Sequence, residues 1–190
     1  MIAGLLLAAG RSRRFGADKL AAKLDGKAVI RWSAESLTSL DAVYVVIPPG
    51  ADMLTQALSR LDVNFVINLG RDEGMASSIR AGLAALPRDA DAVVIALADQ
   101  PRIPSTVVHE ICERWRKGDV AAVAPVYSDG RGHPVLFGRE CFEALLSVRG
   151  DVGARSVLDT LDERLALIEV VGPTPADVDT PDILQALQRR

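Results

Sequence analysis

Cysteine and long apolar runs are both scarce in this sequence, and each scarcity excludes a class of protein. The chain has 190 residues but only two cysteines, Cys112 and Cys141, which form neither a C-x-x-C pair nor a zinc-ligand spacing. No apolar run approaches the length of about 20 residues that a membrane span requires. The first run, residues 2–7, lacks the basic segment of a signal peptide. We therefore expect reduced thiols, no membrane partner and a soluble, cytoplasmic protein.

A strong net charge is missing too. The formal charge is −3 at pH 7, so we expect no nucleic-acid partner. The sequence also lacks the G-x-S-x-G turn of many hydrolases, the G-x-x-x-x-G-K-[ST] phosphate loop and the G-x-G-x-x-G dinucleotide loop. The second apolar run ends in Ile47-Pro48-Pro49 rather than in an acidic residue that could bind a ribose. These absences disfavour a serine hydrolase and an NAD-dependent oxidoreductase.

What the sequence does contain is an alternation of apolar runs and helical patterns. Mostly continuous runs of the kind found in strands covered on both faces occupy residues 2–7, 42–47, 63–67, 92–98, 120–126 and 165–171. Helical spacing follows at residues 29–40, 51–61, 75–86, 105–117, 139–148, 153–161 and 182–190. We predict one α/β domain over residues 1–190, with a Rossmann-like three-layer α/β/α fold and a mostly parallel sheet.

The loop after the first run is the strongest candidate site. It runs from Ala8 to Lys19, includes Ala9 and Gly10, and carries four basic residues. Backbone amides at Ala9 and Gly10 can bind an anion, and Arg14 and Lys19 can neutralise a polyphosphate. The alternative is a solvated basic turn. The position directly after a buried strand favours the phosphate site.

A second loop, residues 70–82, leads into a helix that carries Ser77 and Ser78 in its first turns. Free amides and hydroxyls at a helix start can bind a base, a ribose or a phosphate. An ordinary helix start, with Gly82 allowing close packing of helix and sheet, explains the same residues. Taken alone, this motif favours the packing interpretation.

Two aspartates are candidate metal ligands. Asp99 ends an apolar run, where a buried carboxylate needs a partner such as Mg²⁺ bridging to phosphates. Asp179, which follows the last run, can be the second ligand of the same ion. An N-cap role competes at this second position, because Thr180-Pro181 is also a good helix start. The two roles use different residues, so both can hold.

Two further glycine-containing loops, residues 130–137 and 150–155, complete the candidates. His133 and Arg155 are suited to an anionic second substrate, since glycines let the backbone approach a ligand. A lone histidine before a proline is more often a turn residue than a catalyst. We assign no general-base chemistry to either loop.

Five motifs occur in order along almost the whole chain, and together they resemble the MobA-like nucleotidyltransferase family, in its molybdenum cofactor cytidylyltransferase branch. They are Leu7-Ala8-Ala9-Gly10-x-Ser12-x-Arg14-Phe15-Gly16-x-x-Lys19, Gly74-Met75-x-x-Ser78-Ile79-x-Ala81-Gly82, Asp99-Gln100-Pro101, Gly132-His133-Pro134 and Asp179-Thr180-Pro181. The resemblance implies a Rossmann-like fold of the nucleotide-diphospho-sugar transferase type. The guanylyl-transferring branch typically has Leu-Ala-Gly-Gly, one more residue before the lysine and an asparagine in place of Asp179. These differences favour CTP over GTP.

The resemblance also implies a role for each candidate residue. Arg14, Lys19 and Asp99 are the expected catalytic residues, and Asp99 and Asp179 are the expected Mg²⁺ ligands. The expected nucleotide-binding residues are Leu7, Ala8, Ala9, Gly10, Arg14, Lys19, Ser77, Ser78 and Gly82. The expected acceptor-binding residues are Gly132, His133, Pro134, Asp151 and Arg155.

The implied reaction transfers CMP from CTP to molybdopterin that carries molybdenum, with release of pyrophosphate. Two alternatives stay open. One is transfer from GTP or another NTP to molybdopterin, or to a sugar or polyol phosphate. The other is a non-catalytic protein that binds nucleotide or cofactor and delivers the cofactor to a client molybdoenzyme or its chaperone.

Overall fold

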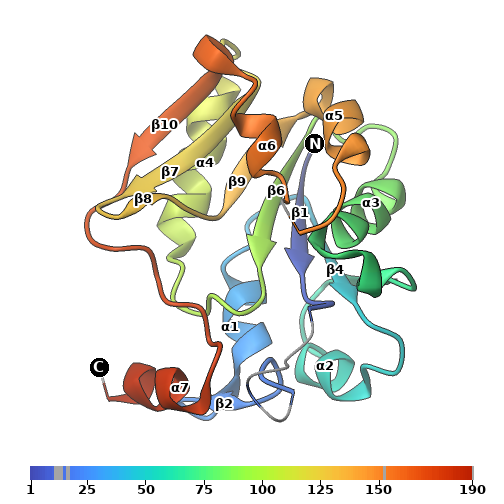
Figure 1. Ribbon diagram of the computed structural model, residues 1–190, viewed down its shortest axis with the longest axis vertical. Coiled ribbons are helices and arrows are strands. Elements are labelled where there is room, and N and C mark those ends of the chain that lie inside the picture. The colour runs from blue at the N-terminus through green and yellow to red at the C-terminus, as the bar shows by residue number, and fades with distance from the viewer. Residues whose placement is uncertain (11–14, 16–17, 152, 190) are drawn as a thin grey trace.

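The computed structural model describes residues 1–10, 15, 18–151 and 153–189 of the chain. An eight-stranded sheet, in the order β10-β7-β9-β6-β1-β4-β5 with β8 paired to β7, forms its centre (Figure 1). The strands are β1 Ile2–Leu7, β4 Ala42–Ile47, β5 Asn64–Ile67, β6 Ala92–Leu97, β7 Ala122–Tyr127, β8 Gly130–Arg131, β9 Val135–Gly138 and β10 Leu165–Glu169. A separate antiparallel pair consists of β2 Lys23–Leu24 and β3 Lys27–Ala28.

Helices cover the sheet on both faces. They are α1 Val29–Glu35, α2 Asp52–Ala57, α3 Met75–Ala85, α4 Ser105–Arg116, α5 Phe142–Ser147, α6 Arg155–Leu158 and α7 Pro181–Gln188, with 3₁₀ turns η1 Arg71–Glu73, η2 Arg139–Cys141 and η3 Asp162–Arg164. None of the helices in the described part of the chain combines the length and hydrophobicity of a membrane span.

The two cores follow from the alternation of side chains along β1. Ile2 and Leu6 belong to the core beneath α1, α2 and α4, whereas Leu5 and Leu7 belong to the core beneath α3, α5 and α6. Because β1 has a helix layer on each face, all six of its residues are buried. This explains its continuous apolar run and confirms the predicted three-layer α/β fold.

Two strands contradict the sequence-based assignment, the two-residue β8 and the longer β9. Residues 130–137 were expected to form a loop, but Val135–Gly138 form β9, which pairs antiparallel with both β6 and β7. β9 is only four residues long, follows Gly132-His133-Pro134 and ends at Gly138, so its apolar run is too short to be distinguished from a loop by pattern alone. The sheet is therefore mixed, with a mostly parallel arrangement.

The order of strands places a crevice at the carboxyl end of β1. The chain proceeds from β1 to β4 and β5 on one side and then returns to β6 on the other side of β1. Such a reversal in an open sheet creates a ligand-binding crevice between the strands where the direction changes. In Figure 1 the segment after β10 passes the end of β6 on its way to α7, so distant parts of the chain meet there.

Candidate functional site

A lysine lies between two carboxylates at the end of β6. Lys19 Nζ donates hydrogen bonds to Asp99 Oδ2 at 2.6 Å and to Asp179 Oδ1 at 2.8 Å. All three side chains are mostly shielded from solvent, with exposed fractions of 12% for Lys19, 23% for Asp99 and 27% for Asp179. The structure thus brings together three of the residues that the sequence singled out, from segments up to 160 residues apart.

The local sequence explains how Asp179 reaches this position. Val178, which is fully buried, donates a backbone hydrogen bond to the carbonyl of Asp99 at 2.8 Å and so attaches the last segment to the end of β6. Thr180 then caps α7 by accepting a hydrogen bond from Ile183 N, and Pro181 follows at the first helical position. The predicted helix cap is confirmed, and it leaves the carboxylate of Asp179 available to Lys19.

The charge of Lys19 is strongly favoured. Burial alone lowers the pKa of a lysine, but hydrogen bonds to Asp179 and Asp99 and their negative charges outweigh burial and raise the pKa of Lys19 above its ordinary value. Lys19 is therefore protonated over the physiological pH range, and it offsets the repulsion between the two carboxylates.

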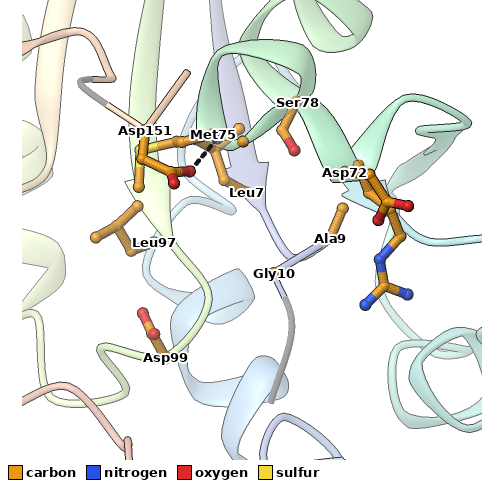
Figure 2. A pocket seen from close by; sticks show the side chains of 11 residues that line it. Leu7, Ala9, Gly10, Asp72, Met75, Ser78, Leu97, Asp99 and Asp151 are labelled. Atoms are coloured by element: carbon orange, nitrogen blue, oxygen red, sulfur yellow. Dashed lines mark hydrogen bonds between the residues drawn. The ribbon is translucent and has the colours of Figure 1, made fainter. Parts of the chain in front are cut away.

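A cavity of about 350 Å³ opens beside this cluster (Figure 2). We call it the first cavity. Asp99 and Leu97 lie on its β6 side, and Leu7, Ala9 and Gly10 lie at the end of β1. Arg71, Asp72, Gly74, Met75, Ser78 and Asp151 complete the wall. The cavity therefore occupies the crevice predicted by the strand order.

The expected nucleotide-binding residues are not all equally accessible to this cavity. Leu7, Ala9, Gly10 and Ser78 line it, whereas Ala8 donates its backbone N–H to Val46 O within the sheet at 2.8 Å. Arg14 lies outside the described residues, so its predicted phosphate contact remains a prediction.

Asn68 organises the two serines of α3, and the sequence analysis missed this role. Its Nδ2 donates to Ser77 Oγ at 2.9 Å and to Ser78 Oγ at 3.0 Å, and its Oδ1 accepts from Gly70 N. Ser77 in turn donates to Gly74 O at 2.8 Å. Asn68 is 2% exposed, so the network is internal. An asparagine directly after an apolar run was the available signal.

Gly82 has a packing role in the structure. It lies in α3, and a Cβ atom there would overlap the side chain of Leu5 on β1. Gly82 is absent from the wall of the first cavity. The geometry supports the packing interpretation of this glycine, rather than the nucleotide contact that the resemblance implied.

Asp151 lies on the first cavity, although the sequence grouped it with the acceptor residues. Its Oδ1 accepts a hydrogen bond from Met75 N at 3.1 Å, and the neighbouring Gly150 O accepts from Ala76 N (Figure 2). The loop of residues 150–151 thus satisfies free amides at the start of α3. Gly74, with φ of 87°, has no space for a side chain against this loop.

A second cavity, of about 250 Å³, lies on the other side of β6. Three of the expected acceptor residues, Gly132, His133 and Arg155, line it, whereas Pro134 is buried and does not. Leu97 borders both cavities. Gln100 and Asp177 also line the second cavity, although the sequence analysis assigned them no role. Their signal was their adjacency to Asp99 and Asp179.

His133 is enclosed beside the backbone carbonyl of Ile95, which lies 3.5 Å from its Nδ1. Burial lowers its pKa below the ordinary value of 6.5, which favours the neutral ring. Its backbone carbonyl accepts a hydrogen bond from Tyr127 Oη at 2.9 Å, and burial raises the pKa of Tyr127 to about 12. A side chain at Gly132 would meet the Tyr127 ring at 2.8 Å. Gly132 therefore permits the close approach of this loop to Tyr127.

The residues present suit a divalent cation that is shared with a substrate. Among the described residues, no cluster of three or more histidines, cysteines, aspartates or glutamates could enclose a metal by itself. Mg²⁺ is usually bound through one or two carboxylates plus substrate phosphates and water. Asp99 and Asp179, which Lys19 brings to one point, fit that donor set.

The fold and the site define an α/β protein with a crevice at the strand ends. There Asp99 lines a cavity large enough for part of a nucleotide and is bonded to Lys19, which also bonds Asp179. Residues 4–165 match the MobA-like NTP transferase domain, and the chain belongs to this family of nucleotidyltransferases. The predicted family is therefore confirmed. Asp177 and Asp179 lie beyond the matched residues.

The names of proteins similar to this chain give different activities. A nicotine blue oxidoreductase of Paenarthrobacter nicotinovorans is 29% identical over 98% of this chain and 96% of its own length. A probable molybdenum cofactor guanylyltransferase of Thermococcus gammatolerans is 27% identical over 70% of this chain and 66% of its own length. The chain is thus similar to proteins whose names give different activities.

Solved structures show the same fold. A crystal structure of Rv0371c from Mycobacterium tuberculosis has a TM-score of 0.88, with 27% identity over 100% of this chain and 98% of that one. A second structure of Rv0371c, in complex with manganese, has a TM-score of 0.84, with 24% identity over 99% and 98% of the two chains. The expected nucleotide-diphospho-sugar transferase type of fold is confirmed.

Proposed function

We propose that the protein transfers CMP from CTP to the molybdenum cofactor, with release of pyrophosphate. The observation that carries this proposal is the meeting of Lys19, Asp99 and Asp179 at the crevice between β1 and β6. A nucleotidyltransferase needs cationic and metal-binding groups at the point where a triphosphate is cleaved. Lys19, Asp99 and Asp179 are groups of this kind, and the membership of the chain in a nucleotidyltransferase family supports this role for them.

The first cavity is the proposed nucleotide site. Ala9 and Gly10 offer backbone groups at the end of β1, and Ser78 offers a hydroxyl at the start of α3. A side chain at Gly10 would meet no atom of the described residues within 4 Å, so these residues leave space beside the backbone for a phosphate. When Lys19 leaves the two carboxylates, its ammonium group can supply a positive charge to the triphosphate.

Asp99 and Asp179 would hold Mg²⁺, which neutralises charge on the phosphates when bound. The manganese complex of Rv0371c supports a divalent ion in proteins of this fold. In the structure Lys19 lies between the same two carboxylates, so a bound cation and Lys19 compete for them. Occupation of the site by metal would release Lys19 toward the triphosphate.

The acceptor side needs little proton chemistry. An oxygen of the acceptor's terminal phosphate attacks the α-phosphorus of CTP, a new P–O bond forms, and the bond between the α-phosphorus and the bridging oxygen to the β-phosphate breaks. Pyrophosphate leaves with that oxygen. Because the nucleophile is already an anion, it needs no strong base. Catalysis then rests on positioning and charge neutralisation. This agrees with the lowered pKa and enclosed position of His133.

The test is pyrophosphate release with each NTP and Mg²⁺, in the presence and absence of molybdopterin carrying molybdenum. We expect release only when CTP and the cofactor are both present. Preferred use of GTP would contradict the cytidylyl assignment. Release with a sugar or polyol phosphate, but not with the cofactor, would identify another nucleotidyltransferase.

A second candidate function is oxidation and reduction, because the nicotine blue oxidoreductase matches the chain over 98% of its length. The missing dinucleotide motif and the absence of an acidic residue after β4 argue against NAD binding. Titration with NADH and CTP separates the two candidates. Tight NADH binding without CTP binding would favour the redox function.

A further inference from the structure

β5 forms one edge of the sheet, and its exposed side chains are largely apolar. It stands last in the strand order, and no strand of the described chain pairs with its outer edge. Phe65, Ile67 and, just beyond the strand, Leu69 are 40%, 58% and 84% exposed. Sheet edges are usually protected by charged residues or proline, and residues 63–69 contain neither. This edge is therefore open to a further strand.

The backbone of β5 directs hydrogen-bonding groups away from the sheet at Phe65 and Ile67. Asn68 N donates to Ile47 O on β4 at 2.9 Å, so the backbone groups of Asn68 and Val66 face β4. The direction of these groups alternates along a strand, so the N–H and C=O groups of Phe65 and Ile67 face away from β4. A strand added at this edge would bond to these two residues.

The edge is symmetric in residue type about Val66. Large apolar residues flank it on both sides, asparagines follow, and aliphatic residues end the run, which reads Val63-Asn64-Phe65-Val66-Ile67-Asn68-Leu69. When two copies pair antiparallel about Val66, Phe65 of each lies opposite Ile67 of the other. Both residues have outward backbone groups, so each such pair exchanges two hydrogen bonds, and the two side chains lie on the same face of the sheet. The register that matches the residue types is thus one that the backbone permits.

The charged residues beside this run complement one another under the same pairing. Arg60 and Asp62 precede β5, whereas Arg71 and Asp72 follow it. Antiparallel pairing brings the start of one strand beside the end of the other, so Asp62 of one copy lies near Arg71 of the other, and Arg60 lies near Asp72. Asp62 forms no ion pair with a described residue, and Arg71 Nε has no described hydrogen-bond partner. A second copy therefore supplies opposite charge at both ends of the paired strands.

We propose that the protein forms a symmetric dimer in which β5 of two copies pairs antiparallel about Val66 and the two sheets become one. A two-fold contact uses the β5 edge of both copies, so assembly stops at two. The paired segment is short, which places the interface at the low end of the sizes of specific complexes and predicts dimerisation at about 10–100 µM protein. The inference goes beyond the proposed function and does not depend on it.

The test is sedimentation equilibrium of the full chain over concentrations that span this range. We expect a monomer–dimer equilibrium for wild type. Ile67→Lys should weaken dimerisation by more than about tenfold, because the charge enters the interface twice and faces an apolar residue. Leu167→Lys is the matched control, since Leu167 is 53% exposed on β10, the opposite edge strand of the sheet. Its dimerisation constant should change by about twofold at most.

Disulfide trapping tests the register. Val66→Cys places two cysteines opposite each other across the axis, at a pair without backbone hydrogen bonds whose Cα atoms lie about 4.5 Å apart, a separation that a disulfide spans. Diamide should convert this variant to a covalent dimer. Asn64→Cys is the control, because the same register holds its two copies about 13 Å apart. Wild type should give no covalent dimer, since Cys112 and Cys141 are buried.

Several results would overturn the inference. They are a wild-type monomer at every concentration, a dimer that Ile67→Lys leaves intact, and equal dissociation of the dimer by Leu167→Lys and Ile67→Lys. Assembly beyond two copies would contradict a closed two-fold contact. Equal cross-linking of Val66→Cys and Asn64→Cys would contradict the pairing about Val66. Thermal unfolding of each variant verifies that a loss of dimer is not a loss of fold.

Discussion

The two cavities on either side of β6 differ in the partners of their carboxylates. At the first cavity, Asp99 is bonded to Lys19, which also bonds Asp179. At the second, Asp177 is bonded to the uncharged amide of Gln100. Each wall also contains one buried polar atom without a described partner, Arg71 Nε in the first and Gln100 Oε1 in the second. The carboxylates of the first site are thus paired with a cation, whereas Asp177 is hydrogen-bonded to a neutral group.

This difference predicts different responses to mutation. Removing a group from the first cavity changes an existing internal balance of charge, so its effect extends to metal binding and stability. Removing Gln100 breaks its internal hydrogen bond to Asp177, whereas removing Arg155 breaks no ion pair with a described residue. The following experiments test that contrast.

The largest effect is expected for Asp99→Ala. We expect metal-dependent transfer to fall by more than about 100-fold, since loss of even an outer-shell partner of a metal typically costs 10–100-fold. The rate of pyrophosphate release at saturating Mg²⁺ measures this transfer activity. Asp182→Ala, which removes an exposed aspartate from the first turn of α7, is the control. Near-normal turnover of Asp99→Ala would refute the metal assignment.

Lys19→Met should have two opposite effects. Activity should fall, because the triphosphate loses a cation. Mn²⁺ binding without nucleotide should tighten by about tenfold, because the carboxylates lose the positive charge that competes with the metal. Electron paramagnetic resonance of free Mn²⁺ measures the affinity, with Lys23→Met as the control. Weaker Mn²⁺ binding would show that Lys19 organises the carboxylates and does not compete for them.

A pair of glycines separates packing from ligand binding. Gly82→Ala should lower the free energy of unfolding by about 1–3 kcal/mol, because its Cβ overlaps Leu5. At Gly10→Ala the described residues leave room for the new Cβ, so the variant should keep its stability nearly unchanged while binding CTP more weakly. Urea unfolding and CTP titration measure the two quantities. Loss of CTP affinity in a stably folded Gly82→Ala variant would restore the nucleotide role of Gly82.

The smallest effect concerns pH and His133. Its folded pKa lies below 6.5, so the unfolded chain binds a proton more readily. The contribution of the neutral ring to stability is therefore present above pH 6.5 and is lost as pH falls below it. As pH falls through this range, the unfolding free energy of the wild type should decrease relative to that of His133→Gln. A constant difference from pH 7.5 to 5 would contradict the prediction.

The sequence predicts the elements that have long, continuous apolar runs. β1 and β4 begin and end at the predicted residues. The run of β4 is bounded by Asp41 and Pro48, and that of β1 is followed by the small residues Ala8, Ala9 and Gly10. α1 ends at Glu35, although helical spacing continues to residue 40. The spacing of apolar residues therefore predicts the end of this helix poorly. β9 was missed because a four-residue run after a glycine-containing loop has no distinctive period.

The sequence predicted those site residues that directly follow apolar runs, because residues at the carboxyl ends of parallel strands lie close together. Asp99 and Asp179 were selected because both follow apolar runs, and the structure places them on the same lysine. Asn68 and Gln100 were not selected, because the roles of amide side chains depend on partners that are distant in sequence. Asp177, for example, is 77 residues from Gln100.

The hydrogen bond from Val178 to Asp99 has a consequence for the order in which the site is assembled. The region that defines the family ends at residue 165, and the sheet is complete at Glu169, yet one of the two carboxylates arrives only with Asp179. A growing chain can therefore form every strand before the site is whole. Truncation after residue 169 would preserve the sheet residues and remove the second partner of Lys19, separating folding from the capacity to act.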